Sequence, residues 1–145
     1  MTAILQRGNG AGTQFDLSEQ NKVCGSLVFF GVDPNNPTQE KMITISYEGH
    51  TYRNNRIYMP SESKRNNGTW RLQLNGVDPV DGSILTKSMQ RGYLKHKVLV
   101  FERVADSHYA LSVFPNNDLD EFINGSGLVA KNGTGRGNAR YFGAF

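Results

Sequence analysis

The amino-acid sequence predicts a mainly β fold, an antiparallel open pseudobarrel with two short helices. Two observations support this prediction: apolar and polar residues alternate along several short segments, and 16 glycines against 5 prolines indicate many tight turns. The 145 residues, 37% of them hydrophobic and 20% charged, suit one globular domain better than a disordered chain. We therefore expect a single domain over residues 1–145.

Five segments have the pattern of strands. Along residues 41–47 and 69–75 every second side chain is apolar, which predicts one buried side and one solvent-facing side. Residues 97–104 are more uniformly apolar, as expected of a central strand. Residues 108–114 follow after a short loop, so these two segments predict an antiparallel hairpin. Residues 127–130 are a further short candidate.

Two brief helices are predicted. Ser18 is the expected N-cap of the first, ahead of the apolar residues in 23–27. Asn117 is the expected N-cap of the second, which Gly125 should end. The acidic residues within 118–121 suit the positive end of that helix dipole, so we interpret them as helical and not as a metal site.

The composition excludes several classes of protein. No apolar run approaches the roughly 20 residues that cross a bilayer, and Met1 is followed by polar residues without a secretory pattern. The single cysteine, Cys24, excludes an intramolecular disulfide and a cysteine-based zinc site. We expect a cytoplasmic protein without cofactor, bound metal or membrane association, and a monomer when the domain is isolated.

Basic residues are concentrated in two segments of the chain. Residues 50–71 and residues 87–103 each contain five basic residues and one acidic residue, whereas residues 104–130 contain four acidic residues and no lysine or arginine. The net charge is +3. This segregation favours one basic face for a polyanion, and an ordinary solvated surface is the alternative.

Residues 51–58, TYRNNRIY, place polar side chains where a strand should run. Arginine can donate two hydrogen bonds to guanine, and asparagine can pair with an adenine edge. Because side chains alternate along a strand, we expect Arg53 and Asn55 to share one exposed side. An exposed edge strand kept soluble by charge is the alternative. The candidate DNA-binding residues of this segment are Tyr52, Arg53, Asn54, Asn55 and Arg56.

Residues 7–14 form a second polar segment, in which glycines allow close approach to a partner. The segment lacks the spacing of a phosphate-binding P-loop, and a flexible N-terminal loop is the alternative. Its candidate DNA-binding residues are Arg7, Asn9, Thr13 and Gln14. The candidate phosphate contacts elsewhere in the chain are Lys64, Arg65, Lys95 and Lys97.

Residues 5–133 resemble the N-terminal effector-binding, DNA-binding domain of EcoRII-type restriction endonucleases, which shares the pseudobarrel of the plant B-three domain. The resemblance lies in the order of local patterns: GNGAGTQ before the first helix, RNNR at residues 53–56, and VLVFERV and YALSVF followed by DLDEFINGSGLVAKNG. It implies sequence-specific binding of double-stranded DNA, with two arms gripping the duplex from the major groove. In this chain they would be residues 7–14 and 52–56.

The resemblance also implies a role in restriction-modification, in which this chain is the target-recognition domain of a bacterial restriction endonuclease. The nuclease domain would be fused to it or separate, so the chain could be the N-terminal part of a larger enzyme. The family pattern has an acidic residue in its second arm where this chain has Asn55. The recognised DNA sequence is therefore left open.

Two other classes of function are alternatives to DNA recognition. A small Mg²⁺-dependent nuclease would need carboxylates and a lysine, and Asp33, Glu62 and Lys64 have a loose version of that spacing. The segment of Glu62 and Lys64 has the composition of a loop, which argues against this nuclease. A carbohydrate-binding or phage structural β-module is the other alternative. Each of the three histidines is expected to stand alone, so no catalytic residue is assigned.

Overall fold

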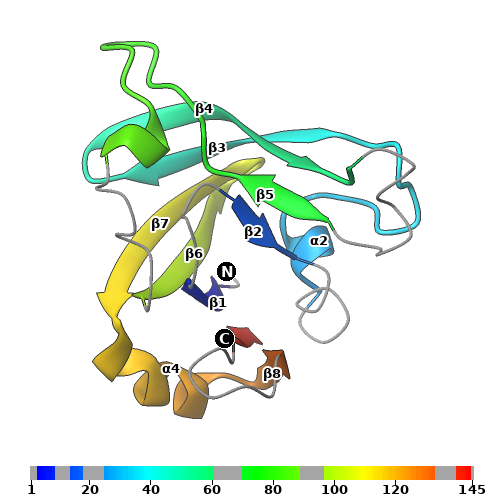
Figure 1. Cartoon of the computed structure of the whole chain (residues 1–145), viewed down its shortest axis with the longest axis vertical. Coiled ribbons are helices and arrows are strands. Elements are labelled where there is room, and N and C mark those ends of the chain that lie inside the picture. The colour runs from blue at the N-terminus through cyan, green and yellow to red at the C-terminus, as the bar shows by residue number, and fades with distance from the viewer. Residues whose placement is uncertain are drawn as a thin grey trace.

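The structure, a computed structural model, describes residues 3–8, 14–17, 25–60, 70–88, 97–132 and 140–144. The fold is mainly β, as the sequence predicts (Figure 1). Its elements are β1 (Ala3–Gly8), β2 (Gln14–Asp16), α2 (Ser26–Phe29), β3 (Lys41–Tyr47), β4 (His50–Tyr58), β5 (Arg71–Gln73), η1 (Leu85–Ser88), β6 (Lys97–Ala105), β7 (His108–Pro115), η2 (Asn116–Asp118), α4 (Leu119–Gly125), β8 (Leu128–Asn132) and β9 (Arg140–Ala144).

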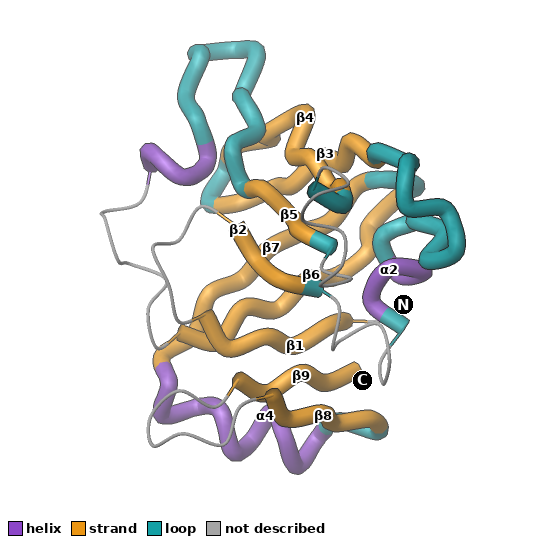
Figure 2. The backbone as a smooth tube through the Cα atoms, turned by 45° about the vertical axis from the view of Figure 1, so that its right-hand side comes forward, coloured by secondary structure: helices purple, strands orange, loops and turns teal. Residues whose placement is uncertain are grey.

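The nine strands of the described residues form one sheet in the order β2-β5-β4-β3-β7-β6-β1-β9-β8. Figure 2 shows them stacked from β4 near the top to β8 beside α4 at the bottom. Neighbouring strands are antiparallel except β3 and β7, which pair in parallel through residues 44–46 and 108–110. The predicted hairpin over β6 and β7 is confirmed. The sheet is thus mostly antiparallel, with one parallel contact that joins the β3–β4 hairpin to the β6–β7 hairpin.

The sheet curls around one hydrophobic core. Leu72 on β5 and Leu99 on β6 belong to the same buried cluster, although β4, β3 and β7 separate their strands in the sheet. The predicted alternation along β3 is confirmed, because Ile43, Ile45 and Tyr47 are buried and the residues between them are not. This arrangement is an open, incompletely closed barrel.

The first part of strand β6, residues 98–101, is buried or half-buried on both sides, as its apolar sequence predicts. Leu99 faces the main core, while Val98, also fully buried, packs in a second cluster with Leu119 of α4. In that cluster the rings of Phe114 and Phe122 lie 4.9 Å apart. The second helix therefore covers the outer side of β6 and β7.

The second predicted helix begins later than the sequence predicts. Ser18 lies outside the described residues, and the described helix α2 begins after Gly25, whose φ of 65° favours glycine. Asn117 is not the N-cap of α4, because the tight 3₁₀ turn η2 carries the chain out of β7 first. The helix starts at Leu119, which places that side chain against Val98.

Among the described residues, none of the helices has the length and apolar character that a membrane crossing requires.

The aromatic cluster at the end of α2 generates a stability prediction. Phe30 is buried, and its ring meets those of Phe101 and Tyr109 edge-on at 5.4 and 4.9 Å. Phe30→Ala should cost about 3–5 kcal/mol of unfolding free energy, measured by urea denaturation, because it leaves a cavity. Val28→Ala is the control: Val28, in α2 two residues before Phe30, is 65% exposed, so its change should stay within about 0.5 kcal/mol. Equal losses would show that this cluster does not anchor the core.

Candidate nucleic-acid interface

The middle of β4 contains a β-bulge. Ile43 of β3 pairs with Asn55 and Ile45 pairs with Tyr52, so two steps along β3 correspond to three along β4. The extra residue is accommodated at Asn54, whose φ of 67° lies in the left-handed region. Asparagine tolerates this conformation better than most residues. One added residue shifts the alternation of side chains on the far side of the bulge.

The bulge decides which side chains of β4 reach solvent. Tyr52 and Asn55 are both fully buried, whereas Arg53 and Asn54 are both exposed. The prediction that Tyr52 and Asn55 contact DNA is therefore wrong, and Arg53 and Asn55 do not share an exposed side. That prediction assumed unbroken alternation, which the extra residue removes.

The carboxamide of Asn55 satisfies the backbone around the bulge. Its Nδ2 donates to the carbonyl oxygens of Tyr52 at 2.9 Å and Ile43 at 3.2 Å, and its Oδ1 accepts from the N–H of Gly76 at 2.9 Å. A Cβ on residue 76 would lie 2.5 Å from the Asn55 Nδ2, so glycine is required there. One side chain thus ties together β3, β4 and the segment after β5.

Residues 76–85, here called the tip hairpin, continue from this contact and form the green loop above β4 in Figure 1. The Arg53 N–H donates to the Val77 carbonyl at 2.8 Å, and the Val77 N–H donates back at 2.9 Å. The Asp78 N–H donates to the Ser83 carbonyl at 2.8 Å and closes the hairpin. Both backbone polar groups of Arg53 are therefore bonded to Val77, while the Arg53 side chain is exposed and has no partner among the described residues.

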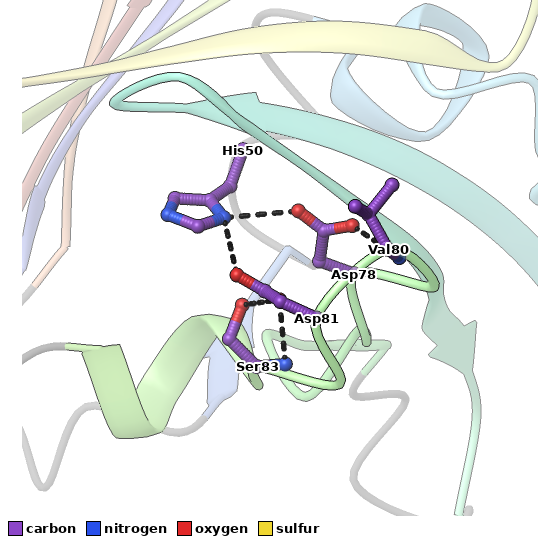
Figure 3. Close-up of polar contacts among 5 residues, drawn as sticks. All are labelled: His50, Asp78, Val80, Asp81 and Ser83. Carbon is purple, nitrogen blue, oxygen red and sulfur yellow. Dashed lines mark hydrogen bonds and ion pairs between the residues drawn. The ribbon is translucent and has the colours of Figure 1, made fainter.

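Two carboxylates and a histidine fasten the tip hairpin to the start of β4 (Figure 3). His50 Nδ1 lies 2.9 Å from Asp78 Oδ2 and 3.4 Å from Asp81 Oδ2. Because carboxylates accept, Nδ1 carries the proton. The Val80 N–H and the His50 ring together hold the pKa of Asp78 below its usual value, and the Ser83 N–H and hydroxyl do the same for the pKa of Asp81.

These three side chains are the one group among the described residues that could hold a metal ion, with ligand atoms within 4.8 Å of one another. Each carboxylate, however, already accepts a turn N–H on its other oxygen, from Val80 and from Ser83. The arrangement works as a clamp without any ion. The expectation that every histidine stands alone is wrong for His50.

A second histidine also has a partner. His108 Nε2 lies 2.6 Å from Ser46 Oγ, across the parallel pairing of β3 and β7. This distance matches a nucleophile and its base. In the described residues, however, no carboxylate is bonded to the other nitrogen of this ring. The pair is accounted for as a cross-strand hydrogen bond that reinforces the one parallel contact of the sheet.

The outer side of β4 continues beyond the bulge as a basic and aromatic surface. The Arg56 guanidinium carbon lies 3.9 Å from the centre of the Tyr58 ring, and Arg56 also forms an ion pair with Glu40. The Gln73 Nε2 donates to the Tyr58 hydroxyl at 3.3 Å. On the neighbouring strand Arg71 is paired in register with Tyr58.

The structure separates the two ends of the predicted N-terminal arm. Arg7 lies in β1, next to β6, and Gln14 lies in β2, at the far edge of the sheet next to β5. Asn9 and Thr13 lie outside the described residues. The alternative, a flexible loop over residues 7–14, is wrong at both ends of the segment, because Arg7 and Gln14 lie in paired strands.

Few of the remaining predicted residues are described. Lys97 is half-buried at the start of β6, opposite Pro115. Of the nuclease spacing, Asp33 is described, and its Oδ1 accepts the Asn35 N–H in an exposed turn. The other candidates lie outside the described residues: Glu62, Lys64, Arg65 and Lys95.

Sequence reasoning missed the partners that fix this surface, namely Glu40, Gly76 and the two carboxylates of the tip hairpin. The turn composition DPVDGS at residues 78–83 is a signal that could have located the hairpin. Its contact with His50 joins residues 28 positions apart, which no local pattern encodes. No protein-family model matches the chain, and no curated protein does either.

Asn55 generates the first prediction for this site. Asn55→Ala should lower the unfolding free energy by about 2–4 kcal/mol, because it leaves a buried N–H and two carbonyls without their partner. Asn54→Gly removes the neighbouring carboxamide but keeps the left-handed conformation, so its unfolding free energy should change by less than about 1 kcal/mol. Urea denaturation of both variants measures the difference. Similar stabilities for the two variants would contradict a structural role for Asn55.

The clamp at the tip hairpin predicts a pH dependence. Because the folded pKa of Asp78 lies below its unfolded value, its carboxylate stabilises the fold above about pH 4, and this contribution is lost as the pH falls through the folded pKa. Asp78→Asn should flatten the loss of thermal stability between about pH 5 and pH 3. Glu102→Gln, an exposed carboxylate on β6 without a partner among the described residues, is the control and should keep the wild-type slope. An unchanged slope in Asp78→Asn would show that Asp78 does not contribute to the pH dependence of thermal stability.

Proposed function

We propose that this chain binds double-stranded DNA sequence-specifically, as the target-recognition domain of a restriction endonuclease whose nuclease domain is fused to it or separate. One observation carries the proposal: the bulge exposes Arg53 and Asn54 side by side, on a backbone fixed by the tip hairpin. Neither side chain has a partner among the described residues. A guanidinium and a carboxamide held in this way can each make two hydrogen bonds to a base edge.

Two further features support a nucleic-acid partner. Arg56 lies on the same outer side of β4 as Asn54, two residues further along, where it could contact a phosphate. The open pseudobarrel agrees with the resemblance to EcoRII-type recognition domains. In this proposal Arg53 and Asn54 contact bases, while Arg56 positions the backbone of the duplex. The domain would act as a monomer in the cytoplasm, where bacterial DNA is found.

The proposal predicts different losses for different variants. After a binding site is selected from a random pool of duplexes, Arg53→Gln or Asn54→Gly should weaken binding to that site by about 5- to 150-fold, the equivalent of one lost base contact. Asn54→Gly should change binding to scrambled duplexes much less, because no charge is lost. Arg103→Gln is the charge-matched control, since Arg103 lies at the β6–β7 turn and pairs with Asp106.

The measurement is a competition assay with selected and scrambled duplexes over a series of salt concentrations. Binding to DNA should weaken with salt, in proportion to the phosphates contacted. Failure to enrich any duplex would refute sequence-specific binding. If Arg53→Gln lost no more affinity than Arg103→Gln, the bulge would not be the base-contacting segment.

A further inference from the structure

The Arg56 guanidinium is held in place by an aromatic ring as well as by a carboxylate. It stacks over the Tyr58 ring at 3.9 Å, and the ring is fixed in turn by the hydrogen bond from Gln73 to its hydroxyl. The Arg56 side chain is 37% exposed. A guanidinium on a ring keeps its in-plane N–H groups free for an anion. The site would therefore persist if the carboxylate left.

Glu40 occupies the anion position of this site. Its carboxylate forms the ion pair with Arg56 and is itself 46% exposed, just before β3 begins. An ion pair this exposed adds little to stability, so releasing it costs little. A second guanidinium, that of Arg71, is half-buried on the neighbouring strand beside Tyr58 and has no partner among the described residues. A second cation thus lies on the strand next to the Arg56–Glu40 ion pair.

From this geometry we infer that Arg56 is a phosphate-binding site which Glu40 fills in the free protein and vacates when a phosphodiester binds. The inference rests on the proposed function and deepens it. Glu40 competes equally with the phosphates of every duplex, because phosphates carry no sequence information. It therefore lowers non-specific binding, and the base contacts of Arg53 and Asn54 must compensate for its displacement at the selected site.

The test compares Glu40→Gln with Glu102→Gln, which removes the same charge from an exposed position on β6, separated from β4 by β7 and β3. Glu40→Gln should bind selected and scrambled duplexes about 2- to 5-fold more tightly than Glu102→Gln, the range expected for one released exposed ion pair. In an Arg56→Gln background the difference should disappear. All three side chains changed are exposed or half-exposed, and thermal melts confirm that the variants fold.

Inorganic pyrophosphate gives a readout that does not depend on DNA. In an NMR titration, the Arg56 Nε–H signal should shift at lower pyrophosphate concentration in Glu40→Gln than in wild type or Glu102→Gln. If Glu40→Gln behaves as Glu102→Gln in both assays, or if its gain survives Arg56→Gln, the inference is wrong. If wild type binds no duplex but pyrophosphate shifts Arg56 as described, the proposed function fails while the anion site stands.

Discussion

The candidate interface depends on one buried carboxamide. A β-bulge leaves backbone groups without ladder partners, and buried backbone groups must be satisfied. Asn55 meets that requirement with three hydrogen bonds, to β3, to β4 and to Gly76. The glycine allows the approach, because any Cβ there would overlap the carboxamide. Without this contact the bulge, the tip hairpin and the exposed pair Arg53 and Asn54 would lose their common support.

The tip hairpin holds β4 in place through further contacts. Its backbone pairs with Arg53 on one side, and its two aspartates bind His50 at the start of the same strand. Strand β4 is thus fastened to the hairpin at His50, Arg53 and Asn55, while the side chains on its outer side are exposed or half-buried. Rigid backbone with free side chains is the arrangement that base recognition requires, because binding then orders few additional groups.

The polar side chains along that outer side differ in whether they already have partners. The two exposed side chains at the bulge have no partners among the described residues, whereas Arg56 already binds a carboxylate and a ring. The unpaired side chains of Arg53 and Asn54 can hydrogen-bond directly to a base edge. Arg56 adds attraction for a phosphate only after Glu40 leaves it. This difference separates residues suited to base contacts from a residue suited to the phosphate backbone.

Local sequence patterns are sufficient to predict the fold class, most of the strands and the position of the polar segment within a strand. Period-two alternation records which side of β3 is buried, and the apolar first part of β6, residues 98–101, records burial on both sides. The local composition also placed carboxylates in the first turn of α4, although η2 moved the start of that helix.

Which polar side chains of β4 face outward depends on contacts between segments that are distant in the sequence. The sequence RNNR is compatible with either set of side chains facing outward, and the choice depends on the one residue inserted at the bulge. The bulge is supported by the hydrogen bond between Asn55 and Gly76, which are 21 positions apart. The same holds for His50 with Asp78 and for Ser46 with His108, which are 28 and 62 positions apart. Strand pairing brings these groups together, and alternation within a single strand carries no information about its partner.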